Sequence, residues 1–235
     1  MANQELAAWK RLPSGEAGRV LGPIQSVQYG PDLGTERELR LLGHLAGKRV
    51  LELGCGAGQS LVVMADQGAH AIGLDPVAGQ LAAARRLAEQ EGVKIELHQG
   101  DLADLAFMRG DSIDLVFSAY ALAFEEDLNR VFRQVHRVLK EGAPMVFSLP
   151  HPAYDVIDDR EEPLVVRHSY FERSSSGGGV HRTFSDLFAG LFRAKLRIDA
   201  MLEPPPADGP RSPYWREAAR LIPRTLIIRA RKEGI

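Results

Sequence analysis

The sequence predicts an α/β fold in which a doubly wound, mainly parallel sheet carries helices on both faces. Three observations lead to this prediction. Short apolar stretches alternate with amphipathic helical ones, and a glycine-rich turn joins the first predicted strand to a helix. The third is that 235 residues with 45% hydrophobic content are enough for the core of one domain.

The first predicted strand, Val50–Leu53, runs directly into the glycine loop Gly54–Gly58. Glycines at such a junction let the backbone turn sharply and approach a ligand closely, because no Cβ stands in the way. Upstream, Thr35 and Glu38 have the spacing of a capping box, which predicts a helix that starts there and ends near Gly47.

The following elements are predicted from the same alternation. Buried-type apolar runs predict strands, and apolar residues at three- and four-residue spacing predict helices. These strands are expected at 71–75, 93–98, 113–118 and 143–149, and the helices after Val77 and over 128–139.

The charge at the glycine loop indicates which ligand it binds. A dinucleotide fingerprint, G-x-G-x-x-G, would need glycine where the chain has Gln59, and Glu52 stands two residues before Gly54. A carboxylate at ~4 Å from a pyrophosphate charge would repel it by roughly 4 kcal/mol at a surface-like dielectric. The loop therefore favours a cationic ligand such as S-adenosylmethionine, which carries an ammonium and a sulfonium and no phosphate.

With these features, residues 50–58 resemble motif I of the class I S-adenosylmethionine-dependent methyltransferases. The resemblance covers about residues 48–149, and the chain around Tyr29-Gly30-Pro31 and Pro150-His151-Pro152 looks like a bacterial group of these enzymes without an assigned substrate. It implies a Rossmann-like, seven-stranded sheet whose last strand, 225–230, is antiparallel and pairs with 195–201.

The resemblance also implies which residues hold the cofactor S-adenosyl-L-methionine. Asp75 ends the second strand and is placed to accept the ribose hydroxyls, although an acid there also suits the start of a helix. Asp101 and Leu102 resemble the loop that meets the adenine, and Gln80 would flank the adenosine. The full predicted set is Tyr29, Glu52, Gly54, Cys55, Gly56, Asp75, Pro76, Gln80, Asp101, Leu102, Ser118 and Tyr120.

The chain is expected to divide into an N-terminal helical cap (1–47), a cofactor-binding core (48–149), an insertion (150–183) and a C-terminal part of the same sheet domain (184–235). The insertion combines acids, aromatics and a Ser/Gly run. Two interpretations stay open for it, a mobile lid over the substrate pocket and a floppy surface insertion.

Three side chains outside the cofactor motifs are candidates for catalysis. His151 follows the fifth strand at the carboxyl edge of the sheet, where an imidazole could act as general base. Tyr170 and His181 are second candidates because they lie on the insertion. Each could instead serve the structure, and a metal site of His151, Asp155 and Asp158 is a remote alternative, so no metal is predicted.

Composition narrows the function further. A net charge of −2 and a pI of about 6.4 argue against nucleic acid as substrate. Neither a signal peptide nor a membrane-spanning run is visible, and a single cysteine fits a reducing, cytoplasmic location. Residues 118–121 lack the Asn/Asp-Pro-Pro-Tyr signature of many enzymes that methylate bases or glutamine, and no acid at that strand end could hold magnesium.

The sequence thus predicts methyl transfer to an oxygen or nitrogen of a small molecule, mainly through proximity and alignment. Two other functions remain: an NAD(P)-dependent oxidoreductase on the same sheet, and a non-catalytic S-adenosylmethionine-binding module. The assembly state is left open, a homodimer included.

Overall fold

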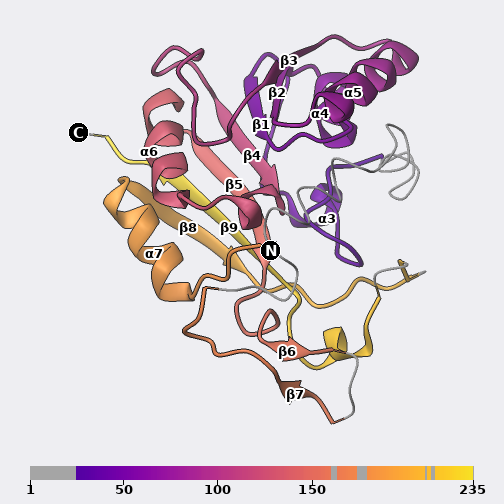
Figure 1. Ribbon diagram of the computed structural model, residues 1–235. Coiled ribbons are helices and arrows are strands. Elements are labelled where there is room, and N and C mark those ends of the chain that lie inside the picture. The colour runs from indigo at the N-terminus through magenta and orange to yellow at the C-terminus, as the bar shows by residue number, and fades with distance from the viewer. Residues whose placement is uncertain (1–24, 160–162, 174–178, 210, 213–214, 235) are drawn as a thin grey trace.

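A seven-stranded sheet with strand order β3-β2-β1-β4-β5-β9-β8 organises the chain (Figure 1). The computed structural model describes residues 25–159, 163–173, 179–209, 211–212 and 215–234. The strands of the sheet are β1 (Arg49–Leu53), β2 (His70–Asp75), β3 (Ile95–Gln99), β4 (Leu115–Ala119), β5 (Pro144–Pro150), β8 (Leu196–Leu202) and β9 (Thr225–Lys232).

The topology confirms the predicted doubly wound sheet. Strands β3, β2, β1, β4 and β5 pair in parallel, whereas β9 lies antiparallel between β5 and β8. The chain order reverses beside β1, which has β2 on one side and β4 on the other. In open α/β sheets, ligands bind at the carboxyl ends of the strands at such a reversal.

Helices cover both faces of the sheet, as predicted. Leu61 of α4 and Leu81 of α5 belong to one apolar cluster with Phe117 of β4, and α6 and α7 build the other cluster over the opposite face. There, the rings of Phe132 and Phe147 meet at 5.7 Å. The elements are α4 (Gln59–Asp66), α5 (Ala78–Glu91), α6 (Leu128–Val138), α7 (Phe184–Arg193) and the short 3₁₀ helices η1 (Ala121–Phe124) and η2 (Glu217–Arg220).

The helix predicted from Thr35 to near Gly47 is much shorter than expected. Helix α3 spans only Glu36–Leu39, and Arg40 ends it with φ of +52°. The Glu36 carboxylate accepts the amide protons of the two residues after Arg40, each at 2.9 Å, so these amides need no helical partner. The following leucines instead turn into the core beneath the sheet. Residues 1–24 of the expected N-terminal cap lie outside the described residues.

The insertion packs against the C-terminal part of the chain. It contains a two-stranded hairpin, β6 (Ile157–Asp158) and β7 (Val165–Val166), which lies low in Figure 1. Tyr154 of the insertion forms a small apolar cluster with Ala218 and Ala219 of η2. Most of its Ser/Gly run, residues 174–178, lies outside the described part of the chain.

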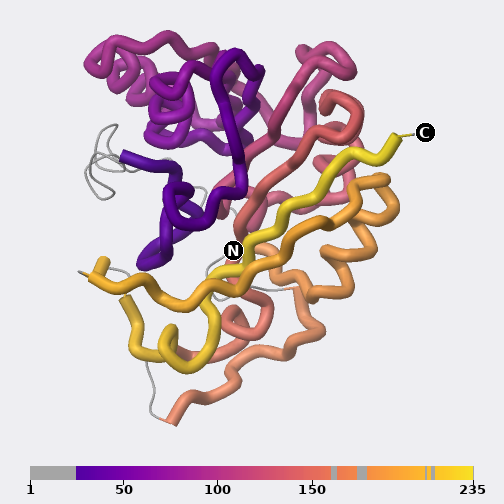
Figure 2. Tube along the Cα trace, turned by 180° about the vertical axis from the view of Figure 1, so that it is seen from behind, coloured from indigo at the N-terminus to yellow at the C-terminus, as the bar shows by residue number. Residues whose placement is uncertain are grey.

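The N-terminal segment is tied to the stretch that follows β8, beside which it runs in Figure 2. The Asp32 carboxylate accepts hydrogen bonds from the amide and hydroxyl of Ser212 at 2.6 and 2.7 Å. Within the described ranges, no helix is long and apolar enough to cross a membrane.

Candidate active site

A cavity of about 500 Å³ lies at the carboxyl ends of β1, β2 and β4, where the strand order reverses. This volume is in the range of small-molecule and cofactor sites. The lining contains eight of the predicted cofactor-binding residues: Gly54, Gly56, Asp75, Pro76, Gln80, Asp101, Leu102 and Tyr120. The other lining residues are Val77, Ala119, Ala121, Phe124 and Glu125.

The three glycines of the loop each have positive φ and a separate reason for lacking a side chain. A Cβ on Gly54 would lie 2.1 Å from the Cβ of Ala121, and one on Gly58 would lie 2.7 Å from the Cβ of Ala84 in α5. A Cβ on Gly56 would meet no protein atom within 4 Å. Because Gly56 lines the cavity, that open space is available to a ligand.

Asp75 holds the glycine loop and the start of α5 together. Its carboxylate accepts the amide protons of Gly56 at 2.9 Å and Val77 at 2.8 Å. Burial raises the pKa of Asp75, although these two amide bonds oppose the shift. The side chain also lines the cavity, so its remaining lone pairs suit ribose hydroxyls.

Glu52 is a buried carboxylate behind the loop, only 4% exposed. Its Oε2 atom has no hydrogen-bond partner in the part of the chain that the structure describes. Burial, and secondly the charge of Asp75, raise the pKa of Glu52 well above its usual value. A buried acceptor without a partner fits the ammonium of S-adenosylmethionine and disfavours phosphate. Glu52 is not itself a lining residue of the cavity.

The acidic loop after β3 is ordered by its own aspartate. The Asp101 carboxylate accepts the amide proton of Ala103 at 2.8 Å, a turn that leaves this side chain and Leu102 on the cavity wall. Gln80 reaches the same wall from the first turn of α5.

Three other predicted cofactor residues do not line the cavity. The Tyr29 side chain is fully buried, and its hydroxyl donates to the Glu36 carboxylate. Its neighbour Gly30 is the residue that lies against the Tyr120 ring, because a Cβ there would be 2.7 Å from it. Burial raises the pKa of the Cys55 thiol. Ser118 is also fully buried and donates to the carbonyl of Leu53 at 2.8 Å, so it joins β4 to β1.

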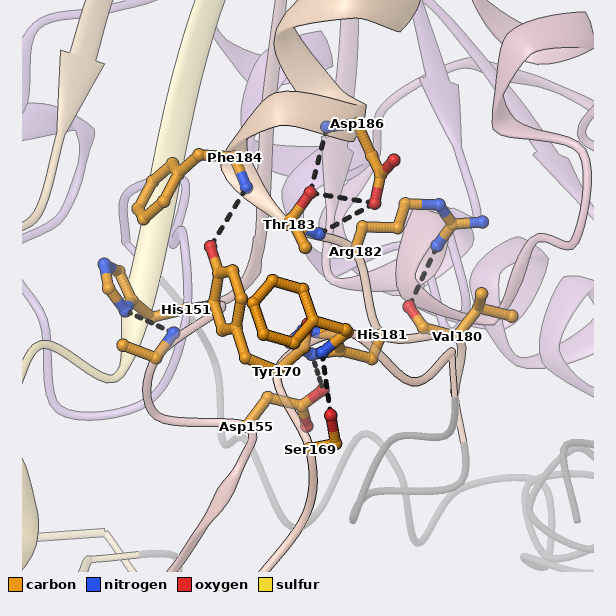
Figure 3. A network of polar contacts seen from close by, with 12 residues as sticks. His151, Asp155, Ser169, Tyr170, Val180, His181, Arg182, Thr183, Phe184 and Asp186 are labelled. Atoms are coloured by element: carbon orange, nitrogen blue, oxygen red, sulfur yellow. Dashed lines mark hydrogen bonds and ion pairs between the residues drawn. The ribbon is translucent and has the colours of Figure 1, made fainter. Parts of the chain in front are cut away.

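His151, the predicted general base, is not among the residues that line the cavity and belongs to the polar network of Figure 3. Its Nδ1 accepts the amide proton of Ala153 at 3.2 Å, so Nε2 carries the ring proton and donates to the Glu203 carboxylate at 2.7 Å. Both ring nitrogens are therefore occupied. A general-base role for His151 stays a prediction.

Tyr170 and His181 belong to the same network (Figure 3). His181 lies 2.9 Å from the Asp155 carboxylate through Nδ1 and 3.1 Å from the Tyr170 carbonyl through Nε2. Both ring nitrogens of His181 therefore have an oxygen partner within the insertion. The Tyr170 hydroxyl accepts from the amide of Phe184 at 3.3 Å. Tyr170 thus links the insertion to α7, whereas His181 bonds within the insertion, and neither side chain lines the cavity.

The remote alternative of a metal site is not supported by the placement of its members. His151 bonds Glu203, Asp155 pairs with His181, and Asp158 pairs with Arg167 at 3.3 Å. No group of three or more potential metal ligands occurs among the described residues.

Sequence reasoning missed Phe124 and Glu125 as cavity residues. They follow the fourth strand, and the only local signal is their position at the carboxyl edge beside the predicted Tyr120. Glu125 is half-buried, and burial together with the charge of Asp101 raises its pKa. Carboxylates of two separate loops thus face one cavity.

Comparison with known proteins agrees with this geometry. A family model described as a methyltransferase domain matches residues 50–142. An S-adenosylmethionine-dependent methyltransferase structure from Mesorhizobium loti is 29% identical, covers 82% of this chain and 94% of its own, and has a TM-score of 0.71. A structure from Listeria monocytogenes described as a putative enzyme of the same kind is 25% identical, with 83% and 95% covered and a TM-score of 0.69.

Among curated proteins, a ubiquinone biosynthesis O-methyltransferase of Hahella chejuensis is 36% identical over 44% of this chain and 44% of its own length. The similarity to that enzyme therefore spans less than half of either protein.

The fold, the cavity and the similar proteins together support a methyl-transferring enzyme. The methyltransferase domain matched over residues 50–142 and the similar solved structures support a class I S-adenosylmethionine-dependent methyltransferase, with S-adenosylmethionine as its cofactor. The oxidoreductase alternative is thereby set aside.

Proposed function

We propose that the protein methylates an oxygen or nitrogen atom of a small molecule, and that alignment of the acceptor in the 500 Å³ cavity supplies most of the catalysis. The cavity carries this proposal because the glycine loop and acids from the loops after β2, β3 and β4 line one open cavity, with apolar residues beside them. The net charge of −2 supports a small acceptor over a nucleic acid.

In this proposal the cofactor lies along the carboxyl edge of the sheet. Gly54 and Gly56 give it room, Asp75 accepts the ribose hydroxyls, and Asp101 with Leu102 meets the adenine. Glu52 stabilises the ammonium group from behind the loop. The cofactor supplies an activated methyl group on a sulfonium.

The protein itself contributes by positioning the acceptor and by excluding water from the cavity. Ala119, Ala121 and Phe124 form an apolar wall next to Tyr120, whose hydroxyl hydrogen-bonds Thr225 and so holds the ring in place. Such a wall excludes water and keeps an acceptor at attack distance, which accounts for a large rate enhancement without a dedicated base.

The charge of the lining indicates the class of acceptor. Asp75, Asp101 and Glu125 line the cavity, and no lysine, arginine or histidine is among the described residues of its lining. A phosphorylated or carboxylated acceptor would meet repulsion, whereas a neutral phenol or an amine would not. The O-methyltransferase named among the relatives is consistent with an oxygen acceptor.

The test is a transfer assay with methyl-labelled cofactor and pairs of acceptors that differ only in a phosphate or carboxylate group. We expect transfer to the neutral phenols or amines and little to their anionic partners. The Asp75→Asn variant should lose about tenfold or more of its cofactor affinity, because a charge-assisted bond becomes a neutral one. Transfer only to the anionic members, or none to any member by a protein that binds the cofactor, would contradict the proposal.

A further inference from the structure

The end of the insertion lies against the cavity wall. The Val180 amide donates to the Ala123 carbonyl at 2.8 Å. A Cβ on Gly179 would be only 2.6 Å from the same carbonyl oxygen. Ala123 belongs to η1, so the insertion is in direct contact with the short helix that follows β4.

Arg182 adds a second connection to this wall. Its guanidinium donates to the carbonyl of Val180 at 3.1 Å, drawn in Figure 3, and to the carbonyl of Glu125. The side chain is 8% exposed, and burial lowers its pKa to about 10. Among the described residues it forms no ion pair with a carboxylate. The buried Arg182 guanidinium therefore binds two backbone carbonyls, those of Val180 and Glu125.

The wall is built on a single short helix, η1. Helix η1 has four residues, begins after Tyr120 with φ of +60°, and is closed by amide bonds of 3.1 Å from Ala123 and 3.3 Å from Glu125. Short 3₁₀ helices have poor hydrogen-bond geometry, so their position depends on neighbouring contacts. The insertion holds the carbonyls on either side of Phe124, and Phe124 and Glu125 both line the cavity.

We infer that Arg182 is a positioning residue that holds the Phe124–Glu125 wall against the bound cofactor. The inference rests on the proposed cofactor placement. It gives the insertion a role in cofactor affinity that does not require a lid movement.

The experiment compares Arg182→Met and Arg182→Lys with the matched control Arg193→Met. Arg193 is on α7, where it donates to the Asn129 side chain at 3.1 Å and does not touch η1. Hydrogen exchange of residues 119–127 is measured in ligand-free protein, and the affinity for S-adenosylhomocysteine is measured by calorimetry.

Arg182→Met should accelerate exchange over residues 119–127 and weaken S-adenosylhomocysteine binding, each by about tenfold. Arg182→Lys should fall between it and the wild type, because an ammonium can still donate to one carbonyl. Arg193→Met should match the wild type in both measurements. If Arg182→Met does not fold, Gly179→Ala tests the neighbouring contact between the insertion and η1, since its methyl group would push the insertion off the Ala123 carbonyl.

If Arg182→Met exchanged faster over residues 119–127 but bound S-adenosylhomocysteine as tightly as the wild type, Arg182 would have a structural role only, and the inference would be overturned. Unchanged exchange in this variant would also overturn it. A wild-type protein that bound no S-adenosylhomocysteine would instead contradict the proposed function. The two failures are therefore distinguishable.

Discussion

At the scale of single residues, Glu52 and Asp75 explain how one loop selects its ligand. Asp75 is buried, but it has two amide partners, while Glu52 has an acceptor atom without one in the described part of the chain. The uncompensated carboxylate is costly in the free protein. A ligand ammonium would offset that cost, and a phosphate would increase it.

A pH prediction follows for Glu52. Its folded pKa is raised above the ordinary value near 4.5, so its contribution to stability is complete below about pH 4.5 and is lost as the pH rises through the raised pKa. We expect Glu52→Gln to unfold at higher denaturant concentration than wild type, with a difference that grows above that pH. Urea unfolding at several pH values measures it.

The same substitution should weaken S-adenosylhomocysteine binding. The ligand ammonium favours the ionised carboxylate, so wild-type affinity should rise with pH through this window, whereas Glu52→Gln should bind more weakly and with a flatter profile. If the Glu52→Gln variant bound S-adenosylhomocysteine as tightly as the wild type across this pH range, Glu52 would not face the ammonium.

Much of the site could be predicted residue by residue because its signals are local. Glu52, Gly54, Gly56, Asp75 and Asp101 stand at strand ends, and the chain's own order brings strand ends together. The histidines could not be assigned this way. Their partners, such as Glu203 for His151, lie far along the chain, and only tertiary structure shows that the ring nitrogens are occupied.

At the scale of elements, two glycines of the β1–α4 loop have different roles. Gly58 allows α4 to approach α5, and Gly56 leaves open space in the cavity. Gly92 provides a control, since it also has positive φ, +68°, and open space around it, but ends α5 outside the cavity lining.

Gly56→Ala and Gly92→Ala should therefore lose similar stability, about 1–2 kcal/mol for a left-handed alanine. Only Gly56→Ala should also weaken S-adenosylhomocysteine binding, because its methyl group enters the ligand's space. Thermal unfolding and calorimetry on both variants check this. Equal affinities in the two variants would contradict the placement of the ligand over Gly56.

Element types were predicted well from periodicity, and element ends less well. The helix starting at Thr35 shows why: a capping box marks a beginning, but the end at Arg40 is set by Glu36 and by leucines that turn into the core. The cavity residues of η1 were missed for a similar reason. A four-residue helix held by another segment has no periodicity of its own.

At the scale of the whole molecule, the sheet order brings the loops after β1, β2, β3 and β4 to one edge. The insertion, the N-terminal segment and the stretch after β8 are bonded to one another and to that edge. Whether residues 150–183 also move as a lid stays a prediction. In this structure His181 and Arg182 are buried, and the Val180 amide donates to the Ala123 carbonyl of η1.

The most direct measurement is thermal unfolding of the wild type and Asp75→Asn with S-adenosylhomocysteine or NAD. At one hundred times its dissociation constant, a ligand adds about 2.7 kcal/mol to stability. We predict that S-adenosylhomocysteine stabilises the wild type by about this amount, Asp75→Asn much less, and that NAD stabilises neither. Stabilisation by NAD equal to that by S-adenosylhomocysteine would show that the cavity accepts phosphates and would contradict the account.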